Sequence, residues 1–296
     1  YEKDYKKYEH MPQPHYTDIS YFIDIDPAAR SVVYSAGIML KNKDQVAIDT
    51  LYFNVPHRMK VKLDIPGAEL VLNDSALDQR MYRLSSPLQP GATIKFTCTG
   101  SWHAKGIPNT VEFTGLVDNG SFLNNMDLIP GIGYDPNGEI HDREKRRKHK
   151  LPPNERMPKL SDDPAKRMDN YIMRYSDWVN VRTTIGTTPD QIAVAPGTLK
   201  KEWTADGKRW FHYELDYKAL NFYSFLRARY EVTRDTWKDP TGKEPDVALE
   251  VYYQKEHGVN VPRMINSLRK SLDYYTANFG PYRQKEARIV EFPRYA

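Results

Sequence analysis

Hydrophobic and polar residues alternate with a period of two along the first hundred residues. In the first such stretch the apolar side chains share one face, at Ile19, Tyr21, Ile23 and Ile25. This alternation predicts a half-buried strand. Similar short strands, separated by Pro, Gly and Asn-Asp turns, are predicted at residues 31–40, 51–55, 61–65, 81–84 and 92–99. No helical periodicity lies between them, so we expect an antiparallel sheet assembly.

A second β-rich set begins near residue 178. Its predicted strands cover residues 178–185, 191–195, 201–203, 208–217, 222–232 and 247–253. Asp206 and Gly207 lie between two of these stretches, and an Asp-Gly pair there predicts a tight hairpin because both central residues need a positive φ. The two sets together predict a mainly β fold built from two packed units.

After residue 257 the apolar residues recur at steps of three and four, at Val261, Met264, Ile265, Leu268, Leu272, Tyr275 and Phe279. This spacing predicts an amphipathic helix over residues 261–279, capped by Asn260 and ended by Gly280 and Pro281. A strand is predicted at 287–292. We therefore expect a β domain over residues 1–256, and over 257–296 the start of an α/β domain whose remainder is missing from this sequence.

Between the two β-rich sets, residues 130–170 are rich in Pro and charged residues and predict an irregular excursion. Its basic core, residues 143–150, reads REKRRKHK. Such a run indicates either a patch for nucleic acid or anionic membranes, or a solvated surface. We favour the solvated surface, because no aromatic residues interleave to stack on bases and the net charge is only +4. No nucleic-acid partner is expected.

The sequence contains no complete catalytic motif. None of its eight histidines belongs to an H-E-x-x-H pair, the helical spacing that binds zinc. The nucleophile elbow and the glycine-rich phosphate loops are also missing. Cys98 falls on the apolar face of the strand predicted at 92–99, which favours a buried thiol. We expect neither a metal site nor turnover from this chain alone, and no apolar run reaches the roughly 18–20 residues of a spanning helix.

The predicted helix, the segment 278–282 (NFGPY) and the strand that follows resemble the start of the catalytic domain in the M1 family of zinc aminopeptidases. The hairpin at Asp206, preceded by residues 195–199, is similar to one in the family's amino-terminal β domain. The resemblance implies an antiparallel β-sandwich, or saddle, domain followed by the first helix and strand of an α/β catalytic domain.

The resemblance also implies a function. The β domain would pack over the catalytic cleft and shape the access of peptides, and the parent enzyme would remove their N-terminal residues. Zinc is expected in the catalytic domain, outside this sequence. Asn124 and Asn125, in a predicted loop, are the candidate contacts for the substrate's free amine, although Asn in a loop is also common turn chemistry.

Residues 128–135, 190–197 and 289–295 are similar to a bacterial branch in which the peptidase is fused to an ABC-transporter-type permease. This implies a place on the periplasmic side of a bacterial membrane. Two alternatives stay open: a β-sandwich module that binds a protein or glycan through its Tyr and Trp residues, and a binder of anionic surfaces through residues 143–150. The apolar stripe of 261–279 is expected to fold back on the β units or to pair with a second copy.

Overall fold

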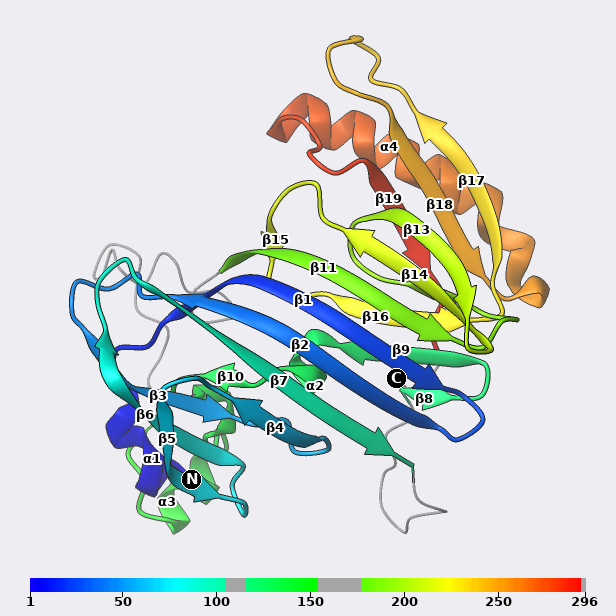
Figure 1. The fold of residues 1–296 in the computed structure, drawn as a ribbon. Coiled ribbons are helices and arrows are strands. Elements are labelled where there is room, and N and C mark those ends of the chain that lie inside the picture. Colours follow the sequence, from blue (N-terminus) through cyan, green and yellow to red (C-terminus); the bar gives the residue numbers. More distant parts are fainter. Residues whose placement is uncertain (105–114, 154–176, 294–296) are drawn as a thin grey trace.

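An eight-stranded sheet runs through the computed structural model, which describes residues 1–104, 115–153 and 177–293 (Figure 1). Its order is β13-β14-β11-β1-β2-β7-β4, and β15 pairs with β11. These strands are β1 (His15–Asp26), β2 (Ser31–Lys41), β4 (Lys60–Asp64), β7 (Thr93–His103), β11 (Trp178–Thr187), β13 (Thr198–Ala205), β14 (Lys208–Glu214) and β15 (Ala219–Leu220). The predicted mainly β fold is confirmed.

Two four-stranded sheets pack against one face of the large sheet, in the orders β10-β3-β6-β5 and β12-β16-β9-β8. Their strands are β3 (Ile48–Asn54), β5 (Ala68–Asp74), β6 (Gln79–Leu88), β8 (Leu116–Val117), β9 (Gly120–Asn124), β10 (Gly131–Ile132), β12 (Ile192–Val194) and β16 (Ser224–Ala228). Tyr21 of β1 contacts Phe225 of β16, and Phe96 of β7 contacts Phe53 of β3, so one apolar core joins the three sheets into a sandwich.

The alternation predicted for the first strand sets the side of the sheet that is buried. Ile19, Tyr21, Ile23 and Ile25 all lie in the core, whereas Phe22 points to the opposite face and is half-exposed. The Asp206–Gly207 hairpin is confirmed as well, since both residues have positive φ and Ala205 pairs with Lys208 across the turn.

The two β-rich sets are joined by a parallel pair of strands. Residues of β1 and β11 lie opposite one another from Asp18 and Asn180 to Asp24 and Gly186. Most other pairs are antiparallel, as predicted. Turn motifs predict pairing only between strands that are adjacent in sequence. They could not predict the pairing of β1 with β11, because residues 27–177 separate the two strands. Strands of both sets consequently share the large sheet, and the sets are not two separate units.

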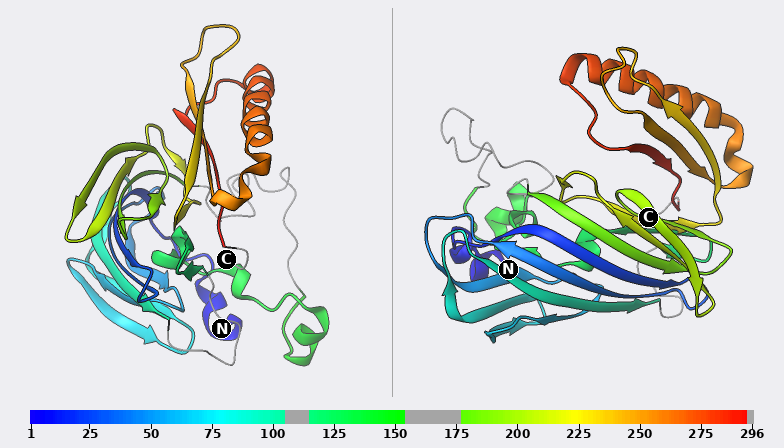
Figure 2. Two further views of the ribbon diagram at one scale, coloured as in Figure 1. Left: turned by 90° about the vertical axis from the view of Figure 1, so that its right-hand side faces the viewer. Right: turned by 45° about the horizontal axis from the view of Figure 1, so that its top comes forward.

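A fourth sheet, β17-β18-β19, carries the long helix α4 on one face (Figure 2). Its elements are β17 (Glu231–Trp237), β18 (Val247–Tyr253), β19 (Glu286–Val290) and α4 (Val261–Phe279). Val261, Ile265 and Leu272 are buried against the apolar face of β18, so the stripe folds back on strands, as predicted. Gly280, with φ at +101°, ends the helix. Asn260 lies at the N-cap position of α4, as predicted, but its side chain makes no capping hydrogen bond, and it is also the last residue of the 3-10 helix η4 (Lys255–Asn260).

The expected division of the chain at residue 257 falls between β18 and α4. However, β18 pairs in parallel with β19, with Ala248 opposite Glu286, so strands from both sides of that position share a sheet. The single strand expected at 222–232 is also two strands, β16 and β17, in different sheets. The buried side chain of Tyr230 lies between them. Residue 257 as a domain boundary stays a prediction.

A helical limb lies at the other end of the molecule from α4 (Figure 2). It comprises α1 (Glu2–Tyr5), η1 (Lys6–Tyr8), η2 (Pro136–Gly138) and α3 (Arg143–Lys148), and α2 (Asn125–Leu128) leads toward it from β9. The ring of Tyr1 stacks on Tyr134 at 5.1 Å, and Tyr5 stacks on Tyr52 at 6.1 Å. The predicted irregular excursion corresponds to this limb up to residue 153, and its residues 154–170 lie outside the described part.

Candidate functional site

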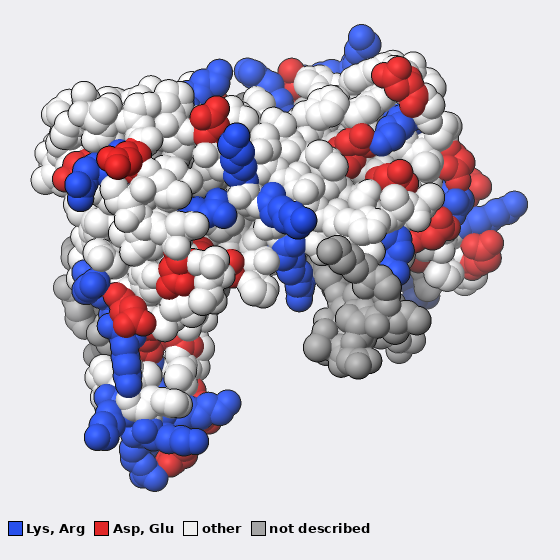
Figure 3. Space-filling view, turned by 60° about the horizontal axis from the view of Figure 1, so that its bottom comes forward, with Lys and Arg blue, Asp and Glu red and all other residues white. Residues whose placement is uncertain are grey.

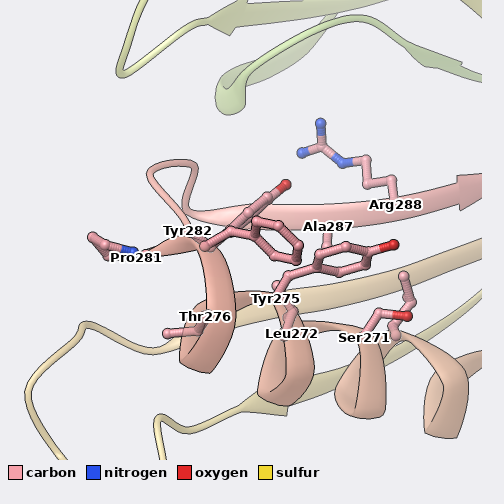
Figure 4. A pocket seen from close by; sticks show the side chains of 11 residues that line it. Ser271, Leu272, Tyr275, Thr276, Pro281, Tyr282, Ala287 and Arg288 are labelled. Atoms are coloured by element: carbon pink, nitrogen blue, oxygen red, sulfur yellow. The ribbon is translucent and has the colours of Figure 1, made fainter.

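A cavity of about 460 Å³ opens between the C-terminal half of α4 and β19 (Figure 4). Gly280 and Pro281 end the helix there and turn the chain back, which places Tyr282 and Ala287 opposite the last helical turns. The residues that line it are Leu268, Ser271, Leu272, Tyr275, Thr276, Phe279, Gly280, Pro281, Tyr282, Ala287 and Arg288. Most of this lining is aliphatic or aromatic.

The outer end of the cavity exposes aromatic rings to solvent. Tyr275 is 58% exposed and Phe279 is 75% exposed, although both continue the stripe that is buried nearer the start of α4. Their rings contact one another at 5.7 Å, and Tyr274 joins them. Such a surface can receive an apolar side chain, and it offers no nucleophile with a base beside it. We therefore regard the cavity as a binding surface.

Arg288 joins the α4 layer to the large sheet. Its side chain leaves β19 on the side away from α4 (Figure 4). Its Nε donates to Glu250 at 2.7 Å, its Nη1 donates to the carbonyl of Gly197 at 2.7 Å, and its guanidinium lies 5.5 Å from the ring of Tyr213. Burial of Glu250 opposes its charge, but the bonds from Arg288 outweigh burial, so the pKa of Glu250 is lowered.

A second group of charges lies at the same junction. The carboxylate of Asp216 accepts from the hydroxyl of Thr198 at 2.6 Å and pairs with Lys200 and Lys285 at 3.2 Å each. The Thr198 bond is the main reason why the pKa of Asp216 is lowered, and the two lysines add to it. Glu286 of β19 lies 2.7 Å from the same hydroxyl. Both groups thus connect β13 and β14 with the α4 layer through ionised side chains.

The two asparagines proposed as substrate contacts lie at the corner between β9 and α2. Asn124 caps α2, since its Oδ1 accepts from the backbone of Met126 at 3.1 Å. Asn125 is only 1% exposed. Its Nδ2 donates to the carbonyl and side chain of Asn221, and its Oδ1 accepts from the backbone of Tyr223. Both side chains therefore have structural partners, and the substrate role stays a prediction.

Within the basic run 143–150, one side chain is buried and the others are exposed. Arg146 is 3% exposed and pairs with Glu2 through two bonds of 2.6 and 3.0 Å. It also donates to the carbonyls of Ile140 and Pro152. Its neighbours in the run are exposed, as a solvated surface predicts. The burial of Arg146 could not be read from the sequence, because nothing in the run distinguishes it from Arg147.

Zinc does not fit the side chains that this structure describes. Across residues 1–104, 115–153 and 177–293, no three His, Cys, Asp or Glu side chains come together as a metal site would require. The thiol of Cys98 is fully buried, as predicted, and burial raises its pKa to about 12. None of the described helices is both long and apolar enough to cross a membrane.

Comparison with solved structures shows what the fold is similar to. An M1 zinc metallopeptidase from Deinococcus radiodurans matches with a TM-score of 0.60 at 12% identity. A mutant of the enzyme from that organism, bound to a Tyr-Ser-Ala substrate, matches at 0.62 and 10%. A two-domain M1 zinc metallopeptidase mutant bound to L-tryptophan matches at 0.60 and 11%.

Each match covers 94% of this chain and 56% of the other, so the chain spans just over half the length of these structures. No protein-family model matches the sequence, and no curated protein sequence does. At such identities the likeness establishes the fold: the chain has the mainly β architecture of the amino-terminal part of M1 zinc metallopeptidases.

Proposed function

We propose that this chain is the non-catalytic amino-terminal portion of a zinc aminopeptidase of the M1 type. Its β-sandwich packs over the catalytic cleft of the intact protein and shapes the access of peptides. Residues 257–296 are the first helix and strand of the catalytic domain, and zinc is held by residues outside this sequence. The parent protein removes N-terminal residues from peptides.

The observation that carries this proposal is the extent of the structural match. Nearly the whole chain, 94% of it, matches the fold of these metallopeptidases. The exposed aromatic cavity at the end of α4 supports it, because apolar surfaces of this kind commonly mark interfaces with another part of a protein.

The first test is the coding sequence that follows the codon for Ala296. We expect it to encode an H-E-x-x-H pair and then a glutamate roughly 18–19 residues after the second histidine. The chain of 296 residues should show no turnover of aminoacyl fluorogenic substrates and no stoichiometric zinc. Hydrolysis by the purified chain, or a reading frame without the zinc motif, would overturn the proposal.

The intact protein also allows a test of the packing. Phe279→Asp places a charge on the exposed end of the cavity, and should lower thermal stability and peptidase activity together. Tyr217→Asp is the control, because Tyr217 is similarly solvent-exposed but does not line the cavity. Equal effects of the two substitutions would show that the cavity is not an interface.

The asparagine corner can be tested in the same protein. If Asn124 contacts the substrate amine, Asn124→Ala should raise KM with little change in kcat, since the lost contact would stabilise the bound substrate and the transition state equally. Asn125→Ala should instead lower stability, because it leaves Asn221 and the backbone of Tyr223 without partners. An unchanged KM in the first variant would leave both residues with structural roles alone.

We also propose, from the resemblance of residues 128–135, 190–197 and 289–295, that the intact protein is a bacterial permease fusion with its peptidase part in the periplasm. Fractionation of the source cells should then recover the full-length protein with membranes. Protease added to spheroplasts should remove the peptidase part. Recovery in the soluble cytoplasmic fraction would contradict this placement.

A second function, the binding of a protein or glycan by a β-sandwich module, is favoured by one observation. Phe22, Trp210 and Trp203 form an aromatic row across β1, β14 and β13, with ring centroids 4.9 and 6.4 Å apart. Phe22 is half-exposed. A glycan array, followed by tryptophan fluorescence titration of any ligand found, separates this function from the first, because Trp203→Ala would abolish such binding.

A further inference from the structure

The limb formed by α1 and α3 carries a set of cations that have no ion-pair partner among the described residues. Arg143, Lys145, Lys148 and Lys150 are all exposed, and none forms an ion pair with any residue that the structure describes. Arg147 is exposed too, but it pairs with Glu144 at 2.7 Å. The side chain of Asp142 is used as the N-cap of α3. The acidic side chain within the run, Glu144, and the one just before it, Asp142, are thus engaged, and the four cations remain available.

These cations are held on a fixed support. Arg146 turns inward between them and bonds to Glu2 at 2.6 and 3.0 Å, which ties α3 to α1. Glu139 accepts from Lys6 at 3.0 Å and from the hydroxyl of Tyr134 at 2.9 Å, so the base of the limb is connected to the same network. An ordered support lowers the entropy lost when the cations meet a ligand.

The limb also projects from the body of the protein. Figure 3 shows Lys and Arg side chains gathered at its far end, with few acidic side chains among them. Figure 2 shows α3 set apart from the large sheet and from α4, whereas α1 packs against the sheet that contains β3 and β6. Within the described part of the chain, a flat, extended anionic surface could therefore reach the four cations without meeting other elements first.

We infer that the end of this limb is a docking surface for a bilayer that contains acidic phospholipids. The lysines and arginines match the negative charge of such a surface, and each one near it strengthens binding by roughly fivefold at low salt. A nucleic acid is disfavoured because the nearby rings are already in use: Tyr1 stacks on Tyr134, and Tyr5 on Tyr52. The inference does not depend on the proposed peptidase function.

Co-sedimentation of the purified chain with lipid vesicles tests the inference. Vesicles of phosphatidylcholine with about 30% phosphatidylglycerol should bind the chain at 50 mM NaCl, and binding should be lost at 300 mM because salt screens exposed charges. Vesicles of phosphatidylcholine alone should not bind it. Removing the four charges together, with Arg143→Gln, Lys145→Gln, Lys148→Gln and Lys150→Gln, should weaken binding at least tenfold.

The matched control removes four exposed lysines from the body: Lys41→Gln, Lys60→Gln, Lys62→Gln and Lys95→Gln. It should bind within about twofold of the unchanged chain, and both variants should keep its circular dichroism spectrum and melting temperature, since Arg146 is left in place. Equal losses in the two variants, or no binding of the unchanged chain to the acidic vesicles, would overturn the inference. Tighter binding to heparin or single-stranded DNA than to vesicles would also overturn it, in favour of another polyanion.

Discussion

Arg288 and Arg146 each hold together parts of the chain that are distant in sequence. Arg288 connects β19 to the carbonyl of Gly197 and to Glu250. Arg146 connects α3 to Glu2. A guanidinium suits both places, because it stays charged when buried and its several N–H groups can bond in different directions. At the residue scale, Arg288 fixes the α4 layer to the body, and Arg146 holds the two helices of the limb together.

Replacing Arg288 should therefore be costly. Arg288→Met leaves Glu250 charged and largely buried, and we expect a loss of about 3 kcal/mol in the free energy of unfolding. Arg234→Met is the control, because Arg234 pairs with the same Glu250 but is 63% exposed, and it should cost less than about 1 kcal/mol. Urea unfolding measures both. Similar losses in the two variants would mean that Arg288 contributes no more than a surface ion pair.

Asp239 gives a prediction of pH dependence. Its carboxylate accepts from the hydroxyl and backbone of Thr241 and from the backbones of Lys243 and Glu244, and these bonds, the hydroxyl of Thr241 first, lower its pKa to about 2. In the unfolded chain the pKa of Asp is about 3.9. Because the folded pKa is the lower one, Asp239 stabilises the fold above pH 4, and this contribution is lost as the pH falls toward 2.

The test is a direct titration of the Asp239 carboxyl carbon by NMR, which should give a midpoint near 2. Unfolding of the Asp239→Asn variant should be easier than that of the unchanged chain at pH 7, and the difference should narrow below pH 4. A midpoint near the ordinary value for Asp would show that the turn does not hold the charged form.

At the scale of elements, aromatic packing on the outer face of the large sheet depends on one glycine, Gly186. The ring of Trp210, on β14, lies directly over Gly186, on β11, and a Cβ added at Gly186 would be only 2.6 Å from that ring. Trp210 in turn stacks on Phe22 of β1. Because Gly186 has no side chain, the rings of Trp210 and Phe22, which come from the strands on either side of β11, can stack over this strand.

Gly186→Ala should consequently destabilise the chain by about 1–3 kcal/mol, because the ring has to move. Gly37→Ala on β2 of the same sheet is the control: nothing lies within 4 Å of its Cβ position, and it should be neutral or slightly stabilising. Adding Trp210→Leu to Gly186→Ala should recover part of the loss if the clash is its cause. A neutral Gly186→Ala would show that the ring is not held against β11.

Sequence patterns predicted elements well where one face is buried and the other is exposed. The strand at 247–253 and the helix at 261–279 were predicted with the bounds that the structure gives. β5 was not predicted. Its side chains are mostly exposed, Leu70 and Val71 included, so burial imposes no clear alternation on its sequence. The helical turns of α3 were also missed, since a run of basic residues carries no apolar stripe.

At the scale of the whole molecule, β1 connects the two halves of the β-sandwich. It lies between β2 of the first set and β11 of the second, and Val179 and Val181 of β11 are buried in the core that it shares. Neither half contains a closed core of its own. The folding of the large sheet therefore depends on contacts between residues far apart in sequence.

This arrangement predicts how fragments behave. A fragment of residues 1–153 should fail to fold cooperatively, because β1 lacks one of its two partner strands, β11, and part of the core is missing. Co-expression with residues 177–293 should restore a soluble complex with a single unfolding transition. Urea unfolding, followed by circular dichroism and tryptophan fluorescence, makes the comparison. Cooperative unfolding of the first fragment alone would show that the two sets are independent units after all.

The sequence by itself determined the local features of this protein. Alternation identified the buried face of β1, the Asp206–Gly207 pair identified the hairpin between β13 and β14, and Gly280 identified the end of α4. Only the tertiary structure decided that β1 pairs with β11, that Arg146 turns inward and that Asn125 is enclosed. The physical reason is that a local pattern records which side of an element avoids water. What lies against that side depends on segments that meet only when the whole chain packs.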